Sequence, residues 1–202
     1  MIACQLRPEG VTDQAVLEAM DSVAREQFVP EGARPLAYAD RSLALGGGRF
    51  LPAPAVLGQL LTQMAPVKGE RALVIGAGTG YSAALLVHIG CEVSAVESAP
   101  KLAARARELG ISVVEGPLEA GHNAGAPYQL ILIDGAVGYL PEPVIKQLAD
   151  GGRLGTALIE RTITRLIVGQ KVAGAFGYLS VADAGVAALP GFTRPRPFTF
   201  ER

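Results

Sequence analysis

Short apolar runs alternate with amphipathic segments through the middle of the chain, and this alternation limits the possible folds more than any other feature. Parallel strands need helical crossovers between them, so the pattern predicts an α/β domain with a parallel sheet and helices on both faces. Strands are expected at residues 72–75, 92–97, 113–115 and 130–134, with helices at residues 81–89, 101–109 and 141–148. Residues 153–158, 163–169 and 175–182 are later strand candidates.

The two ends of the chain follow other patterns. Residues 12–27 and 55–65 place apolar residues at helical spacing, and Thr12 or Asp13 is the expected N-cap of the first helix. Residues 43–54 contain a glycine triplet and two prolines, so they are expected to form a loop. The proline-rich stretch LPGFTRPRPFTFER at the end is expected to be extended. Without a sign of a repeat, a single domain is predicted.

The composition excludes several classes of protein. Charged residues make up 18% of the 202 residues and leave a net charge of −1, so neither nucleic acid nor a membrane surface is an expected partner. No apolar run approaches the ~20 residues that cross a bilayer, and the N-terminus lacks the apolar core of a signal peptide, so a cytoplasmic protein is expected. Cys4 and Cys91 are interpreted as reduced thiols. With only His88 and His122 available, no metal centre is expected.

A glycine-rich stretch, LVIGAGTGYS at residues 73–82, joins the first of the alternating strands to a helix through Gly76, Gly78 and Gly80. Glycines at such a crossover allow a tight turn and let a ligand approach the backbone. Glu97 follows about twenty residues after the start of the loop and ends the next strand, which is the usual place for an acid that binds ribose hydroxyls. A ribonucleoside is therefore the predicted ligand, with a plain glycine-rich turn as the alternative.

The spacing of these glycines narrows the choice of nucleoside. A dinucleotide fingerprint would place its third glycine at position 81, which is a tyrosine. No lysine or arginine lies between residues 76 and 89 to bind a pyrophosphate. A ligand without phosphates fits better, and S-adenosylmethionine is the common one.

Longer stretches carry a more specific signal. They read QLRPEGVTD, VAREQFVPEGARPLAYAD, VIGAGTGYSAALL, VEGPL, PYQLILIDGA and LADGGRL. On these stretches the chain resembles the protein-L-isoaspartate O-methyltransferases, from its N-terminus to about Leu154. The resemblance implies a class I S-adenosylmethionine-dependent methyltransferase: a Rossmann-like α/β fold with a seven-stranded, mostly parallel sheet and an N-terminal helical extension. Residues 1–65 would form a helical cap with the substrate loop, and residues 66–202 the cofactor-binding sheet.

The resemblance also implies an activity and partners. The enzyme would use S-adenosylmethionine to methyl-esterify the carboxylate of L-isoaspartyl residues in damaged proteins, leaving S-adenosylhomocysteine. Proteins or peptides that contain isoaspartyl residues would be its partners, and the enzyme would be a monomer or a weak homodimer.

The cofactor site follows from the same resemblance. The glycines contact the methionine part of the cofactor, and Glu97 holds its ribose. The family has a Gly-Asp-Gly turn beside the adenine, and because the aspartate is missing here, Glu115 is a substitute candidate for binding the adenine amino group. The residues expected to bind the cofactor are Gly76, Ala77, Gly78, Gly80, Tyr81, Glu97, Gly116, Pro117 and Asp134.

Two of these residues have alternative interpretations. Tyr81 packs over the cofactor by resemblance, or it is an aromatic residue of the core at the start of a helix. Asp134 supports the cofactor ammonium or positions a substrate amide, because it ends a strand at the ligand-binding edge. The alternative for Asp134 is a helix N-cap or turn residue.

The expected substrate loop, Arg49, Phe50, Leu51 and Pro52, departs from the family, whose Thr-Ile-Ser-Gln-Pro-like stretch offers hydroxyls to the substrate carboxylate. Phe50 and Pro52 replace the threonine and the serine, and neither side chain donates a hydrogen bond. The carboxylate nucleophile is already ionised at neutral pH, so the reaction requires no general base. Losing a neutral donor to this carboxylate costs about 1–3 kcal/mol. Slow isoaspartyl methylation is therefore the leading hypothesis. A methyltransferase for a different acceptor and a silent nucleoside-binding homologue are the alternatives.

Three nearby residues are candidates to compensate for the lost hydroxyls. Arg49 either supplies a charge-assisted contact or faces solvent. Ser42 and Tyr38 precede the loop, and either hydroxyl replaces the lost ones only if the loop folds back.

Overall fold

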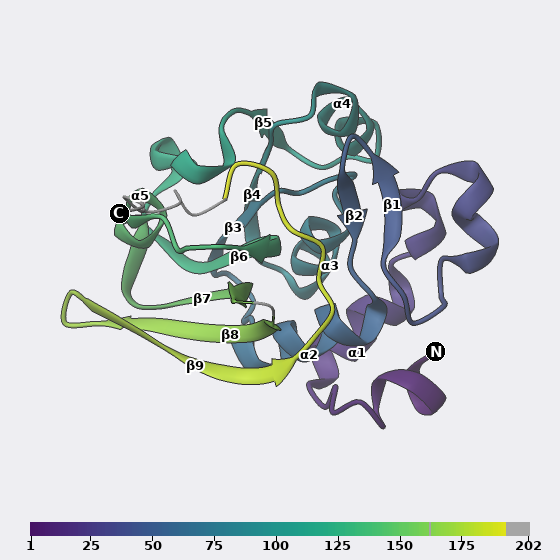
Figure 1. Ribbon diagram of the computed structural model, residues 1–202, viewed down its shortest axis with the longest axis horizontal. Coiled ribbons are helices and arrows are strands. Elements are labelled where there is room, and N and C mark those ends of the chain that lie inside the picture. The colour runs from purple at the N-terminus through teal and green to yellow at the C-terminus, as the bar shows by residue number, and fades with distance from the viewer. Residues whose placement is uncertain (162, 193–202) are drawn as a thin grey trace, which may run out of the picture.

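A seven-stranded sheet forms the centre of the structure, a computed structural model that describes residues 1–161 and 163–192. The strand order is β5-β4-β3-β6-β7-β8-β9 (Figure 1). Strands β3 to β7 run parallel to one another, and β8 and β9 continue the sheet antiparallel. The predicted seven-stranded, mostly parallel α/β fold is confirmed. The strands are β3 (Arg71–Ile75), β4 (Glu92–Glu97), β5 (Val113–Glu115), β6 (Tyr128–Val137), β7 (Leu148–Glu160), β8 (Ile163–Val172) and β9 (Ala175–Asp183).

Two large hydrophobic cores flank the sheet, and a smaller cluster contains Ala136, Ala157 and Leu166. Val74 and Leu132 face a core shared with α1 to α4, whereas Leu73 and Ile131 face a second core shared with α5. Neighbouring residues of a strand point to opposite faces, so the continuous apolar runs of β3 and β6 serve both cores. The helices are α1 (Gln14–Ser22), α2 (Pro54–Met64), α3 (Tyr81–Ile89), α4 (Pro100–Glu108) and α5 (Glu142–Lys146). Shorter helical turns span Ile2–Leu6, Arg25–Phe28, Glu31–Leu36, Leu118–Ala120 and Asn123–Gly125.

The prediction of a loop over residues 43–54 is wrong, because most of this segment is a β-hairpin. β1 (Leu43–Gly46) and β2 (Arg49–Leu51) pair antiparallel, with Leu43 opposite Leu51. The glycine triplet forms the turn at φ values of +97°, +59° and +74°, which favour glycine. Buried and exposed residues alternate along both strands, but this short pattern is obscured by the glycines and prolines around it. We call β1, β2 and their turn the hairpin.

Other boundaries differ from the prediction for reasons of tertiary structure. Asp13, one of the two residues expected to cap the first helix, is its N-cap. The helix predicted over residues 12–27 ends at Ser22, because buried Arg25 donates hydrogen bonds to two carbonyls outside it. The helix predicted over residues 141–148 is shorter and forms only α5. Leu148, the last residue of the predicted helix, pairs instead with Tyr128 of β6. Both β6 and β7 extend beyond the predicted strands at each end.

Residues 184–192, the covering segment, run from the end of β9 across the carboxyl edge of the sheet, beside the hairpin (yellow in Figure 1). The backbone N–H of Ala136 in β6 donates to the carbonyl of Ala187 (2.9 Å), and the N–H of Leu189 donates to the carbonyl of Ala136 (2.7 Å). Leu189 is buried in the second core. The predicted extended tail begins in this segment, and residues 193–202 lie outside the described residues.

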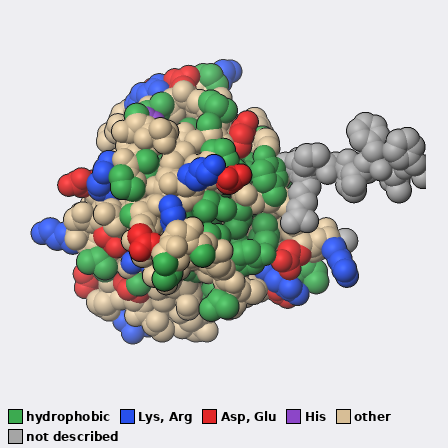
Figure 2. Space-filling view, turned by 90° about the vertical axis from the view of Figure 1, so that its left-hand side faces the viewer, with side chains coloured by type: hydrophobic (Ala, Val, Ile, Leu, Met, Phe, Trp, Pro, Cys, Tyr) green, Lys and Arg blue, Asp and Glu red, His purple; other side chains and the backbone are tan. Residues whose placement is uncertain are grey.

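The surface carries charges of both signs. Figure 2 shows basic and acidic side chains interspersed on one face, with hydrophobic side chains gathered beside them. Cys4 is exposed and Cys91 is buried, and both are free thiols. Within residues 1–161 and 163–192, no helix is long and apolar enough to cross a membrane.

Candidate functional site

The glycine loop, residues 76–80, connects β3 to α3 at the carboxyl edge of the sheet. The strand order changes direction at β3, which lies between β4 and β6, and α/β sheets bind ligands at such switch points. Gly76, Gly78 and Gly80 have φ values of +76°, +58° and +96°, which side chains rarely adopt. A Cβ on Gly76 would also lie 2.9 Å from Nη2 of Arg49. The bare backbone is therefore required both by the turn and by a close contact with the hairpin.

Glu97 joins this loop to the end of β4. Its carboxylate is fully buried. Oε1 accepts hydrogen bonds from the backbone N–H groups of Ser98 (2.8 Å) and Ala99 (2.9 Å), and Oε2 accepts one from the N–H of Gly78 (2.7 Å). The acid and the loop that sequence reasoning paired are therefore in direct contact.

Arg49 of β2 also reaches Glu97. Its Nη2 lies 3.2 Å from Oε2 of Glu97 and donates to the carbonyl of Gly76 at 2.6 Å. The side chain is 3% exposed, so the alternative of a solvent-facing arginine is wrong. Its Nε and Nη1 atoms are buried and have no hydrogen-bond partner among the residues that the structure describes.

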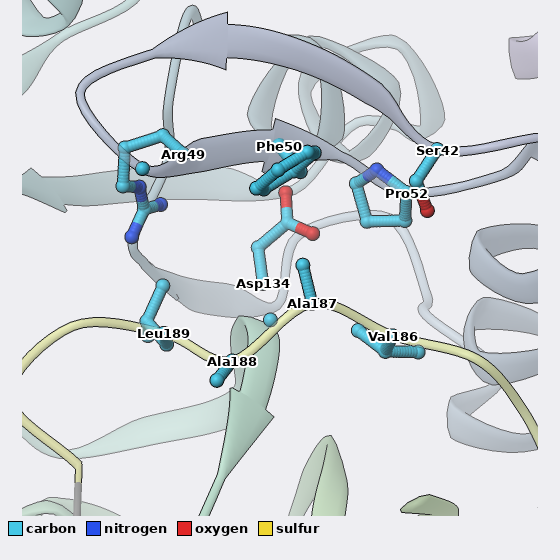
Figure 3. Close-up of a pocket in the computed structure, with 11 residues that line it drawn as sticks. Ser42, Arg49, Phe50, Pro52, Asp134, Val186, Ala187, Ala188 and Leu189 are labelled. Carbon is cyan, nitrogen blue, oxygen red and sulfur yellow. The ribbon is translucent and has the colours of Figure 1, made fainter.

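Asp134 lies beneath the hairpin, in a narrow pocket shown in Figure 3. It belongs to β6 and accepts a hydrogen bond from the hydroxyl of Ser82. Burial raises the pKa of its carboxyl group to about 6, against the opposing effects of Ser82, Arg49 and Arg25. The pocket holds about 10 Å³, which is room for roughly one water molecule. Its lining comes from the hairpin region (Ser42, Arg49, Phe50 and Pro52), from β6 and from residues 186–189 of the covering segment.

The hairpin brings one of the two candidate hydroxyls to this pocket. Since Leu43 and Leu51 are paired, the antiparallel geometry places Ser42 opposite Pro52, and the two residues lie side by side in Figure 3. Tyr38 instead donates its hydroxyl to Glu26 at the surface.

Comparison with known proteins identifies the family. The family model described as Protein-L-isoaspartate(D-aspartate) O-methyltransferase (PCMT) matches residues 1–175. The chain belongs to this family. A Protein-L-isoaspartate O-methyltransferase from Methanoculleus marisnigri is 38% identical over 161 residues, which cover 76% of this chain and 73% of the relative. A protein of the same name from Aeropyrum pernix is 43% identical over 162 residues, covering 74% and 62%.

Solved structures agree with the PCMT assignment. A structure named protein-L-isoaspartate O-methyltransferase matches with a TM-score of 0.82 at 25% identity, over 92% of this chain and 64% of that chain. A structure from Plasmodium falciparum, determined in complex with S-adenosyl-L-homocysteine, matches with a TM-score of 0.79 at 20% identity, over 91% of this chain and 94% of that chain. At 20% identity, the match to the Plasmodium falciparum structure shows a shared fold and nothing more.

The stretch REQFVP, which carries much of the resemblance to the PCMT family, has a structural role. Arg25 is buried and donates hydrogen bonds to the carbonyls of Ala37 (2.7 Å) and Pro52. Its guanidinium lies 4.8 Å from the centre of the Tyr81 ring, and Phe28 packs on the same ring with 5.4 Å between centroids. Tyr81 therefore lies in the core, where Arg25 links it to Pro52, and a contact with the cofactor stays a prediction.

The predicted adenine side of the site lies next to Glu97. The N–H of Gly116 donates to the Glu97 carbonyl at 3.3 Å, and Pro117 follows at the surface. Glu115, the candidate substitute for the aspartate of other PCMT proteins, pairs with Arg107 at 2.6 Å. The roles of these residues toward adenine stay predictions.

The sequence did not predict the apolar contacts that Leu45 and Leu189 make with the glycine loop. A Cβ on Gly78 would lie 2.9 Å from Cδ1 of Leu45, and one on Gly76 would lie 2.9 Å from Cδ1 of Leu189. The alternation of leucines in β1 was a usable signal for Leu45. No local signal existed for Leu189, because its position depends on the path of the chain after β9.

The chemistry of the site fits S-adenosylmethionine. The buried carboxylate of Glu97 ends β4, where a ribose-binding acid is predicted, and an adenosine without phosphates requires no cation on α3. The space in front of the glycine loop, however, is taken by Leu45, Arg49 and Leu189.

Proposed function

We propose that this chain is an S-adenosylmethionine-dependent protein-L-isoaspartate O-methyltransferase, which methyl-esterifies the carboxylate of L-isoaspartyl residues in damaged proteins. The observation that carries the proposal is the family match over residues 1–175, which includes the hairpin, the glycine loop and Glu97. Relatives of about 40% identity bear the name of this activity.

The cofactor is assigned to the carboxyl edge of β3, β4 and β6. When bound, S-adenosylmethionine supplies a methyl group activated by its sulfonium. Glu97 accepts hydrogen bonds from the ribose, the glycine loop lies along the methionine part, and Gly116 and Pro117 border the adenine. Asp134 accepts a hydrogen bond from the cofactor ammonium or from a substrate amide.

Binding of the acceptor requires orientation rather than a general base. An isoaspartyl carboxylate is ionised at neutral pH, so the pocket has to position it and exclude water. Ser42 offers a hydroxyl beside Pro52, at the edge of the pocket that contains Asp134. Phe50 and Pro52 give this pocket an apolar rim.

The same proposal covers the setting of the enzyme. We place it in the cytoplasm as a monomer or a weak homodimer that acts on isoaspartyl proteins or peptides. Its net charge of −1 favours such substrates over nucleic acid.

A methyl-acceptor assay tests the proposal. The protein is incubated with S-adenosylmethionine labelled in its methyl group and with one of two peptides, which differ only in an L-isoaspartyl or an L-aspartyl residue. We expect base-labile methyl ester on the isoaspartyl peptide alone. Binding of S-adenosylhomocysteine without any ester on the isoaspartyl peptide would contradict the assignment.

A further inference from the structure

We propose that Arg49 closes the cofactor site: its guanidinium takes the position on Glu97 that the ribose needs, so the hairpin must open before a nucleoside binds. The inference rests on the cofactor site of the proposed function and adds a residue that sets the affinity of that site. It assigns Arg49 to control of cofactor entry, a role separate from contact with the methyl acceptor.

The hydrogen bonds of Glu97 carry the first step. A carboxylate has about four lone-pair positions for hydrogen bonds. Backbone N–H groups of Ser98, Ala99 and Gly78 take three of them, and Nη2 of Arg49 approaches the fourth. Backbone donors cannot leave without unfolding the loop. Two side chains also reach the carboxylate: the Ser98 hydroxyl lies 3.5 Å from Oε1, and Nη2 of Arg49 lies 3.2 Å from Oε2. Ser98 is the next residue along the chain, whereas Arg49 comes from the hairpin, so the position of Arg49 on Oε2 is the one that ribose hydroxyls can take.

The packing of the loop carries the second step. Leu45 from β1 and Arg49 from β2 come within 2.9 Å of the places where side chains on Gly78 and Gly76 would begin. Both contacts come from the hairpin, and Leu189 of the covering segment lies as close to the Gly76 position. The pocket that Arg49 lines holds about 10 Å³. A nucleoside is many times larger than a single water molecule. Entry therefore requires the hairpin to withdraw, and Arg49 leaves Glu97 with it.

The unpaired atoms of Arg49 carry the third step. Its Nε and Nη1 are buried without a hydrogen-bond partner among the described residues, so only one nitrogen of the guanidinium is satisfied. Leaving charged donors unpaired in the interior is unfavourable. The tip of the hairpin adds little to the stability of the closed arrangement, because no atom of the described residues lies within 4 Å of a side-chain position on Gly46, Gly47 or Gly48. The closed arrangement is thus held weakly enough to open.

Calorimetric titration with S-adenosylhomocysteine tests the inference through Arg49→Ala. If the open hairpin makes up about 10% of wild-type molecules or fewer, the variant binds about tenfold more tightly or better. Arg49→Lys keeps a cation near Glu97 and should bind more weakly than Arg49→Ala. Arg41→Ala removes an exposed arginine just before the hairpin and should bind as the wild type does.

The outcomes separate the inference from the proposed function. Equal affinities of wild type and Arg49→Ala, or weaker binding by the variant, overturn the role of Arg49 and leave the methyltransferase assignment intact. If neither protein binds S-adenosylhomocysteine, both the cofactor site and its closure are rejected.

Hydrogen exchange of the wild-type protein gives a second test that does not depend on a variant. Saturating S-adenosylhomocysteine should speed the exchange of backbone amides in residues 43–51, because the hairpin leaves the glycine loop. Unchanged or slower exchange of these amides would overturn the inference.

Discussion

Phe50 and Pro52 are the residues that most alter what the pocket offers to a carboxylate. Phe50 is 41% exposed on β2, and Pro52 lines the pocket beside Asp134. Neither side chain has a hydrogen-bond donor. Ser42 supplies one hydroxyl in this region, so under the proposed function fewer polar contacts orient the acceptor than the family resemblance implies.

Restoring the hydroxyls should raise the activity. The double variant Phe50→Thr/Pro52→Ser adds two neutral donors, and one such donor contributes about 1–3 kcal/mol when its partner is a buried carboxylate. We expect kcat/KM for an isoaspartyl peptide to rise about tenfold or more. Leu51→Ile, between them, is the control and should change little. A double variant no faster than the wild type would show that the loop does not contact the acceptor.

Asp134 introduces a pH dependence of stability. Burial raises the pKa of its carboxyl group from 3.8 to about 6, so the folded protein binds this proton more tightly than the unfolded chain does. The stabilisation of the folded protein by this proton is complete below about pH 4 and is lost as the pH rises through about 6.

Asp134→Asn should therefore be more stable than the wild type at pH 8 by about 1–3 kcal/mol. The difference should shrink as the pH falls towards 4, and the amide oxygen still accepts the Ser82 hydrogen bond. Urea unfolding at pH 5 and pH 8 measures it, with Asp21→Asn on the exposed side of α1 as the control. A difference that does not change with pH would contradict the account.

At the level of elements, the start of α2 depends on a residue far outside the helix. Ala53 is the N-cap of α2 and provides no side-chain hydrogen bond. Oδ1 of Asp40 accepts a hydrogen bond from the N–H of Ala55 at 3.0 Å. The aspartate of the AYAD stretch thus satisfies a free donor of the helix and fixes α2 relative to the hairpin.

Asp40→Ala should lower the free energy of unfolding by about 1 kcal/mol, the usual effect of losing a capping oxygen. Asp40→Asn is the matched control, since its amide oxygen can still accept from Ala55, and it should stay near the wild type. Thermal and urea unfolding of the three proteins measure the difference. Equal losses of stability in both variants would mean that the charge of Asp40, rather than its capping hydrogen bond, stabilises the protein.

In the molecule as a whole, two segments far apart in the sequence close the carboxyl edge of the sheet. The hairpin reaches the glycine loop from one end of the chain, and the covering segment reaches it from the other (Figure 1). Leu189 belongs to the second core and contacts both Gly76 and Gly135. The edge that binds ligands in this fold is therefore also a packed part of the protein.

Leu189→Ala should lower the free energy of unfolding by about 2–4 kcal/mol, because the side chain is 5% exposed and leaves a cavity. Leu179→Ala in β9 is the control: that leucine is 78% exposed, and its loss should change the stability by less than about 0.5 kcal/mol. If the two variants lose equal stability, the covering segment does not pack on the loop as described.

The limits of prediction follow this division between local and distant contacts. Residues 81–89, 92–97 and 113–115 have the predicted bounds, because glycines and apolar periodicity determine those elements locally. The contact between Glu97 and the glycine loop also follows from neighbouring parallel strands. The ion pair between Arg49 and Glu97 does not, since it depends on how the hairpin folds back across the sheet.

The proposed function depends above all on Glu97 binding the ribose of the cofactor, and a titration with S-adenosylhomocysteine measures that contact. Arg49→Ala is compared with Arg49→Ala/Glu97→Ala, so that competition by the guanidinium is absent from both proteins. We expect the second protein to bind about 10- to 100-fold more weakly, because it loses hydrogen bonds to a charged acceptor. Equal affinity of two folded proteins would contradict it.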